Sequence, residues 1–101
     1  MIHPDIAQDM PNIIAILKNN HVKKAYLFGS AVTDNFNVDS DIDILVTIDD
    51  TLDVMEYGRS YWNILFGLED ELHREIDLLT IESLSNPYFI NEVNTTKVEI
   101  L

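Results

Sequence analysis

Acidic and apolar residues alternate over residues 41–48, and this alternation limits the fold more than any other part of the sequence does. In an extended chain, residues two apart point to the same side, so Asp41 and Asp43 project together from one face. The other face carries Ile42, Ile44, Val46 and Ile48. The pattern therefore predicts a strand that has one buried apolar face and two carboxylates side by side at its start.

Two neighbouring carboxylates on a partly buried sheet are costly, because their charges repel unless a cation or a donor lies between them. A hard divalent cation, which prefers oxygen ligands, removes that cost. A second alternation occurs at residues 75–81, where apolar residues fall on one side of a predicted strand and Asp77 falls on the other. If the two strands align their apolar faces, Asp77 approaches Asp41 and Asp43. Three such carboxylates suit two Mg²⁺ ions bridged by the phosphates of a substrate.

A turn with exposed donors precedes the acidic strand. Residues 24–28 are mostly apolar and stop at Gly29-Ser30, which predicts a buried strand that runs into a turn. Glycine lets the backbone approach a phosphate closely, and the Ser30 hydroxyl adds a further donor. A Gly-Ser pair alone is common in turns, but a strand followed by Gly-Ser, ten residues and Asp-x-Asp is far more specific. Gly29 and Ser30 are therefore the candidate nucleotide-phosphate ligands.

The remaining periodicities predict helices that alternate with the strands. We expect a helix over residues 9–20, a short helical turn and loop over residues 31–40, a long helix over residues 51–74, and a last short helix from Asn86-Pro87 to about residue 93. Such alternation is typical of an α/β (α+β) domain with helices packed on a small sheet. A chain of 101 residues has room for one core, so we expect a single domain over residues 1–101.

The predicted long helix carries two neighbouring apolar rows, which is more than one sheet face can cover. The row expected to face the core contains Val54, Tyr61, Leu65, Leu68 and Leu72. The other row contains Met55, Trp62 and Phe66. An apolar patch of this kind at the surface marks a contact with a partner or with a second copy of the chain.

The charge and composition exclude several classes of function. Eighteen acidic residues against six basic ones give a formal charge of −12, which opposes binding to long nucleic acids. A single nucleotide is compatible, because bound Mg²⁺ screens its phosphates from the carboxylates. Zero cysteines and three scattered histidines exclude a disulfide framework and a thiolate zinc site. With no long apolar run and no signal-like start, we expect a cytoplasmic protein without a membrane partner.

Three features of the chain carry a family resemblance: Leu27-Phe28-Gly29-Ser30, the ten residues between Ser30 and Asp41, and Ser40-Asp41-Ile42-Asp43-Ile44-Leu45-Val46. Together they resemble the signature of the polymerase-beta-like nucleotidyltransferase superfamily, nearest to its minimal nucleotidyltransferases. The resemblance extends through Asp77 to residues 86–90 and covers nearly the whole chain. It implies a mixed-sheet nucleotidyltransferase fold and Mg²⁺-dependent transfer of a nucleoside monophosphate, AMP from ATP, to a hydroxyl group. Two Mg²⁺ ions are expected, for which Mn²⁺ can substitute.

The resemblance also assigns roles to individual residues. It implies that Gly29 and Ser30 bind the triphosphate, that Asp41 and Asp43 bind metal, and that Asp77 binds metal and positions the attacking hydroxyl. The group resembles antitoxins that pair with an all-helical HEPN partner, which some members silence by adenylylating a tyrosine.

The chain departs from the family pattern directly after the serine. Many relatives resemble Gly-Ser-Arg-Ala-Arg-Gly there, whereas this chain continues with Ala31-Val32-Thr33-Asp34. The missing arginines remove bidentate phosphate contacts. Two functions of different class follow: a nucleotidyltransferase whose acceptor is a partner protein or a small molecule, or an antitoxin-type binding module of little or no activity that covers a HEPN-like partner.

Each candidate residue also has a simpler structural interpretation. Asp41 and Asp43 can be solvated residues at the start of a strand, and Asp77 can be exposed or paired with a basic side chain. A metal bound for stability alone is a third alternative, but it leaves Gly29-Ser30 unexplained. Basic residues usually carry solvated charges, although one near the site can replace the missing arginines; those considered are Lys23, Lys24, Arg59 and Arg74.

Overall fold

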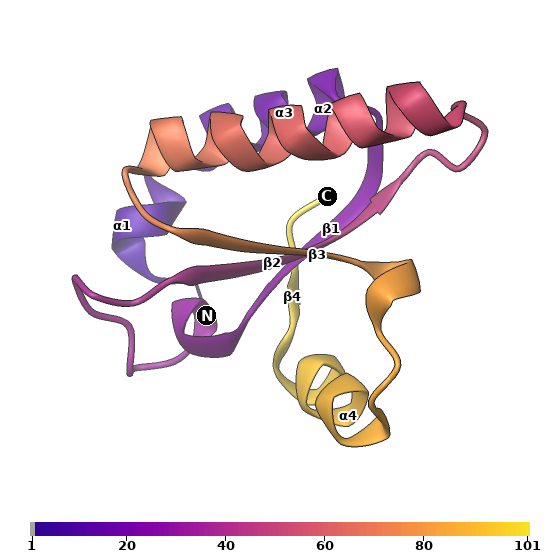
Figure 1. Ribbon diagram of the computed structural model, residues 1–101. Helices are drawn as coiled ribbons and strands as arrows, with labels where there is room; N and C mark the ends of the chain where they lie inside the picture. Colours follow the sequence, from indigo (N-terminus) through magenta and orange to yellow (C-terminus); the bar gives the residue numbers. More distant parts are fainter. Residues whose placement is uncertain (1) are drawn as a thin grey trace.

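The computed structural model describes residues 2–101 as one mixed sheet with helices on both of its faces (Figure 1). The elements in chain order are α1 (Pro4–Ala7), α2 (Met10–Asn19), β1 (Val22–Phe28), the 3-10 helix η1 (Gly29–Val32), β2 (Ile42–Ile48), α3 (Val54–Leu72), β3 (Ile76–Thr80), the 3-10 helix η2 (Ile81–Ser83), α4 (Pro87–Thr96) and β4 (Val98–Glu99). The predicted alternation of helices and strands is confirmed.

The sheet has four strands in the order β3-β2-β1-β4. β1 runs antiparallel to both β2 and β4. β2 and β3 are parallel, because α3 carries the chain back along the sheet between them. The register pairs Asp43 with Phe28 of β1 on one side and with Asp77 of β3 on the other. The mixed sheet that the family resemblance implies is therefore present.

The larger part of the core lies between the sheet and helices α2 and α3, which Figure 1 shows together on one side of the sheet. The apolar face predicted for β2 is fully buried there: Ile42, Ile44, Val46 and Ile48. α4 covers part of the opposite face, where Val93 packs with Phe28 and Leu45. Asp43 lies on this second face, two residues before Leu45 in the same strand.

Local capping explains where the longer helices begin and end. The Asp53 side chain accepts a hydrogen bond of 2.8 Å from the backbone N–H of Glu56 at the start of α3. Asn86 accepts one of 2.9 Å from Tyr88 at the start of α4. α3 ends at His73, whose left-handed φ of 52° stops the helix. Within the described part of the chain, no helix combines the length and apolar character needed to cross a membrane.

The structure corrects several details of the predicted elements. α3 is shorter than residues 51–74, because Asp53 caps it. The assignment of Val54 to the core row is wrong: its side chain is 87% exposed in the first turn, where α3 follows a loop. Ile64, in neither predicted row, is fully buried. α1 and β4 were not predicted, because one is a single turn and the other has only two residues.

Candidate functional site

Three segments of the chain meet at one end of the sheet. β1 ends at Phe28 and turns into η1 at Gly29. β2 and β3 both start at this end, because β2 is antiparallel to β1 and parallel to β3. Asp43 belongs to the middle strand and Asp77 to its neighbour, at the same level of the sheet. The end of β1 and both carboxylates therefore lie side by side.

The electrostatics of this junction centre on Asp43, which is half-buried, whereas Asp77 is exposed. The pKa of Asp43 is raised to about 6, chiefly by burial. The negative charge of Asp77, a hydrogen bond with the Asp77 side chain and the charge of Asp41 raise it further. Two facing carboxylates cannot both be charged without cost. In the absence of a cation, a proton on Asp43 relieves this repulsion below about pH 6, and the repulsion returns as the pH rises.

Gly29 lies directly against the Asp43 carboxylate. Its φ of +70° falls in the left-handed region, which residues with side chains rarely adopt. A Cβ at this position would overlap Asp43 Oδ2 and would lie 3.2 Å from Asp43 Cγ. The backbone conformation therefore favours glycine, and a side chain at position 29 would also displace the Asp43 carboxylate. The absence of a side chain also leaves the backbone of the turn open to the groove.

A groove of about 320 Å³ opens at this junction, a volume within the range of small-molecule sites. The turn, the loop after η1, the paired carboxylates and one side of α4 line it: Phe28, Gly29, Ser30, Thr33, Asn35, Asp43, Asp77, Phe89, Glu92 and Thr96. Asp41 is not among these residues. It is exposed just before β2 and acts on the groove through its charge on Asp43. The structure thus brings Gly29, Ser30, Asp43 and Asp77 into one groove, and Asp41 lies exposed close to Asp43.

α4 supplies a wall of the groove that the sequence analysis did not include in the site. Phe89, Glu92 and Thr96 recur at helical spacing, so they share one side of this helix. Phe89 also packs edge-on against Phe28, with 6.0 Å between the ring centroids. The spacing can be seen in the sequence, but no local pattern shows that α4 returns to the end of β1.

The groove contains none of the basic residues that could replace the missing arginines. Arg74 instead donates hydrogen bonds to backbone carbonyls of residues 37–40. The other basic residues considered above form ion pairs elsewhere: Lys23 with Asp49, Lys24 with Glu99, and Arg59 with Glu56. A polyphosphate in this groove would therefore depend on a cation or on another protein for positive charge.

The donor set fits a hard divalent cation. Among residues 2–101, no three His, Cys, Asp or Glu side chains gather into a preformed metal cage. Mg²⁺ does not require such a cage, because it commonly binds through one or two carboxylates, waters and the phosphates of a substrate. Asp43 and Asp77 lie opposite each other in neighbouring strands, and a cation between their carboxylates would relieve the repulsion that raises the pKa of Asp43. The residues present therefore suit Mg²⁺ or Mn²⁺.

Comparison with known proteins shows similarity over nearly the whole chain. Residues 11–101 match the family described as polymerase beta, nucleotidyltransferase. The chain is also 33% identical over 89 residues to an inferred protein adenylyltransferase of Methanocaldococcus jannaschii. That alignment covers 88% of this chain and 90% of the relative.

Solved structures show the same similarity. A chain of a toxin–antitoxin complex with AMP-PNP is 29% identical and has a TM-score of 0.73, over 92% of this chain and 73% of that one. A chain of a Shewanella oneidensis complex between a tri-AMPylated HEPN toxin and an MNT antitoxin is 28% identical and has a TM-score of 0.66. The second match covers 94% of this chain and 71% of that one.

Proposed function

The chain belongs to the polymerase beta nucleotidyltransferase family, and on that basis we propose that it transfers AMP from ATP to a hydroxyl group of a partner protein. The observation that carries the proposal is one groove in which the Gly29 turn lies against Asp43, and Asp43 lies beside Asp77 of the neighbouring strand. A relative inferred to be a protein adenylyltransferase supports a protein acceptor. A similar structure with AMP-PNP supports an adenine nucleotide as the donor.

In this proposal Asp43 and Asp77 would hold Mg²⁺, with Asp41, exposed just before β2, as the third carboxylate of the metal site. When bound, Mg²⁺ neutralises the phosphates and lowers the pKa of the attacking hydroxyl. The backbone at Gly29 and Ser30 contacts the triphosphate, because no side chain at position 29 blocks its approach. The walls of the groove hold the nucleotide in one orientation, which contributes to the rate by proximity.

The transfer forms one bond and breaks one. The acceptor oxygen attacks the α-phosphorus of ATP, and the bond from that phosphorus to the oxygen bridging it to the β-phosphate breaks, so that pyrophosphate leaves. We assign Asp77 to orient the acceptor hydroxyl and to accept its proton, because Asp77 is the more exposed member of the carboxylate pair. Asp43, half-buried against Gly29, stays in place as a ligand.

The acceptor that we propose is a tyrosine of an all-helical, HEPN-like partner. The support is the similar Shewanella oneidensis complex, in which a HEPN toxin is AMPylated and is bound to an MNT antitoxin. The groove of the present chain has no lysine or arginine in its lining. A basic partner surface beside the groove would supply the positive charge that the chain itself lacks there.

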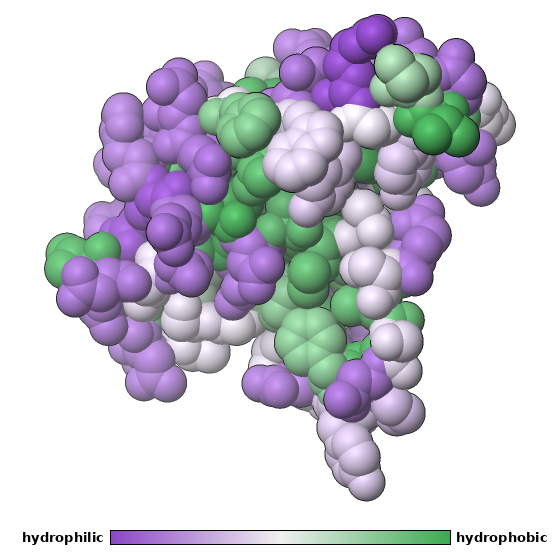
Figure 2. Space-filling view, viewed as in Figure 1, coloured by the Kyte–Doolittle hydropathy of each residue, from purple (hydrophilic) through white to green (hydrophobic). Residues whose placement is uncertain are grey.

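A second candidate function is that of an antitoxin-type module that covers its partner without modifying it. The observation that favours it is an exposed apolar patch on α3, formed by Met55, Trp62 and Phe66, whose side chains are 73%, 53% and 59% exposed. Trp62 and Phe66 stack with 5.6 Å between their ring centroids. Figure 2, viewed as Figure 1, shows green residues along α3 with paler and purple residues between them. Such a patch is typical of a surface that binds another protein.

A transfer experiment separates the two functions. The purified chain is incubated with ATP labelled on its α-phosphate, with and without the protein encoded beside it, in Mg²⁺ and in EDTA. We expect label on the partner in Mg²⁺ only. Asp43→Asn and Asp77→Asn should lower the rate by roughly 100-fold or more, as expected for residues that bind metal or move a proton.

The matched control for that experiment is Asp70→Asn, which makes the same charge change on the exposed surface of α3. This variant should keep the parental rate. Capture of the partner without label in any condition would select the binding module. If the experiment gave no label and no capture of the partner, both functions would be contradicted.

A further inference from the structure

The loop of residues 33–41 joins η1 to β2 and forms one rim of the groove. Thr33 and Asn35 line the groove, and the loop ends at Asp41, whose charge acts on Asp43. Bonds within the loop are short-range: Asn37 N–H donates to Ser40 Oγ at 3.0 Å, and Ser40 N–H donates to the Asn37 carbonyl at 3.1 Å. Such local bonds alone leave a polar loop free to adopt several conformations.

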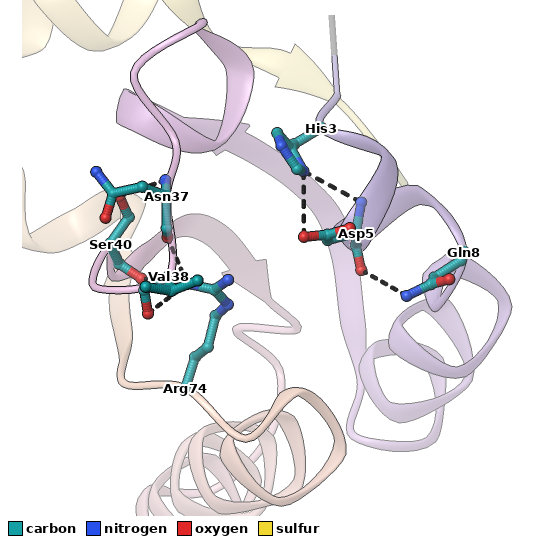
Figure 3. A network of polar contacts seen from close by, with 7 residues as sticks. All are labelled: His3, Asp5, Gln8, Asn37, Val38, Ser40 and Arg74. Carbon is teal, nitrogen blue, oxygen red and sulfur yellow. Dashed lines mark hydrogen bonds and ion pairs between the residues drawn. The ribbon is translucent and has the colours of Figure 1, made fainter.

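Arg74 reaches this loop from the segment between α3 and β3 (Figure 3). Its Nη1 donates to three backbone carbonyls, those of Asn37 at 2.9 Å, Ser40 at 3.0 Å and Val38 at 3.3 Å. Nη1 carries two hydrogens, so the longest of the three is a shared bond. One charged side chain thus binds three carbonyls that would otherwise be satisfied by water.

The same guanidinium also lies over an aromatic ring. Arg74 Cζ is 4.3 Å from the centroid of the Phe36 ring, which is buried. The His3 ring lies 4.7 Å from Phe36, and the backbone N–H of His3 donates to Ala31 in η1 at 3.2 Å. Phe36 therefore anchors the loop in the core between the N-terminal segment and Arg74.

We propose that Arg74 is a positioning residue that holds residues 33–41 in the conformation that completes the groove. Asp77 follows Arg74 by three residues, and the carbonyl of Glu75 accepts a hydrogen bond of 3.1 Å from the N–H of Ile42. The short segment from Arg74 to Asp77 thus carries Asp77 and also holds the loop that leads into Asp43. This inference rests on the proposed function in one respect only, the identity of the ligand that the groove binds.

The geometry distinguishes this role from that of a phosphate-binding arginine. Arg74 directs its donors to the loop, and its planar face covers Phe36. A lysine at this position would keep the positive charge, but it has no planar face to cover Phe36. Arg74→Lys is therefore the informative variant. Its control is Arg59→Lys, the same change at an exposed arginine that pairs with Glu56 on α3.

The first measurement is amide hydrogen exchange in metal-free protein. In Arg74→Lys, the hydrogen-bonded amides of Asn37 and Ser40 should exchange about tenfold faster or more, which is the effect of losing the net contribution of one hydrogen bond. Amides of β2 should keep the parental rates, and Arg59→Lys should change neither set. Phe36→Leu is a second variant, which keeps an apolar anchor without the ring and should loosen the same amides. Unchanged loop exchange in Arg74→Lys would overturn the proposal.

The second measurement tests whether the held loop matters to the site. Mn²⁺ affinity in the presence of ATP should fall roughly tenfold in Arg74→Lys, as expected when a supporting residue around a metal site is lost, and should stay unchanged in Arg59→Lys. Faster loop exchange with unaltered Mn²⁺ affinity would show that the loop does not position the site, and it would overturn the proposal. A parent that binds no Mn²⁺ contradicts the proposed function instead, while the exchange experiment still decides whether Arg74 holds the loop.

Discussion

At the scale of single residues, Gly29 and Asp43 lie against each other, and this predicts how a substitution of Gly29 changes the stability of the protein. Gly29→Ala places a Cβ against the Asp43 carboxylate at a φ of +70°. We expect a loss of at least about 1–2 kcal/mol from the left-handed conformation alone. Gly58 offers the matched control, because it lies inside α3 and a Cβ there meets nothing within 4 Å. Gly58→Ala should stabilise the protein by roughly 0.5–1 kcal/mol.

Urea unfolding of the two alanine variants in parallel measures both effects. Opposite signs for Gly29→Ala and Gly58→Ala are the expected result. If Gly29→Ala were neutral, the left-handed conformation of the turn at Gly29 would be wrong, and with it the groove as described.

The raised pKa of Asp43 makes a prediction about pH. Because this pKa is about 6 in the folded protein, above the ordinary aspartate value, the folded state binds the proton more tightly than the unfolded chain does. The resulting stabilisation is present at low pH and is lost as the pH rises through about 6. In EDTA, Asp43→Asn should therefore unfold at a higher temperature than the parent at about pH 8, and the difference should shrink towards about pH 5.

The expected size of this pH effect is below about 1 kcal/mol, because a half-exposed site is screened by solvent. Thermal midpoints of parent and variant at several pH values, at constant ionic strength, measure it. Asp70→Asn controls for the general effect of removing one charge from a chain of net charge −12. A variant that is less stable than the parent at every pH would show that Asp43 is not under repulsion.

Much of the residue-scale arrangement could be predicted from the sequence. The two alternating segments have the strand period of two, so burying Ile42 and Leu78 on one face necessarily directs Asp43 and Asp77 to the other. The role of Arg74 in the loop could not be predicted. It depends on a contact between residues more than thirty positions apart that no periodicity reports.

At the scale of elements, α3 shows what periodicity can and cannot determine. The pattern predicted a long helix with a second apolar row, and Met55, Trp62 and Phe66 are indeed exposed. It misassigned Val54, because helical spacing does not show where a helix leaves the sheet. The pairing of β4 with β1 and the return of α4 to the groove are long-range contacts, which local sequence patterns do not encode.

The patch on α3 predicts a partner surface that can be changed without harm to the fold. Trp62→Ala and Phe66→Ala should weaken capture of the helical partner by about tenfold or more, because exposed aromatic residues often dominate binding energy. Asn63→Ala, at an exposed neighbouring position of α3, should leave capture unchanged. Pull-down at matched protein concentration, with thermal midpoints as a check on folding, measures the effect. Full capture by both aromatic variants would remove this patch from the interface.

At the scale of the whole molecule, the charge of −12 sets a condition on the proposed nucleotide binding. A triphosphate approaching this chain meets a negative field, and the groove lining offers no lysine or arginine to offset it. Positive charge must therefore come from a divalent cation, from a partner, or from both. In the proposed function, a divalent cation beside Asp43 and Asp77 would supply that charge.

Titration calorimetry with ATP, in excess Mg²⁺ and in EDTA, tests most directly whether Gly29, Asp43 and Asp77 form one metal-dependent nucleotide site. We expect binding by the parent in Mg²⁺ and none in EDTA, because the facing carboxylates repel an unscreened triphosphate. Asp77→Asn should weaken binding in Mg²⁺ roughly tenfold or more, and Asp70→Asn should bind as the parent does. Equal affinity of the parent for ATP in Mg²⁺ and in EDTA would contradict the account, because the carboxylate pair would then not be the nucleotide site.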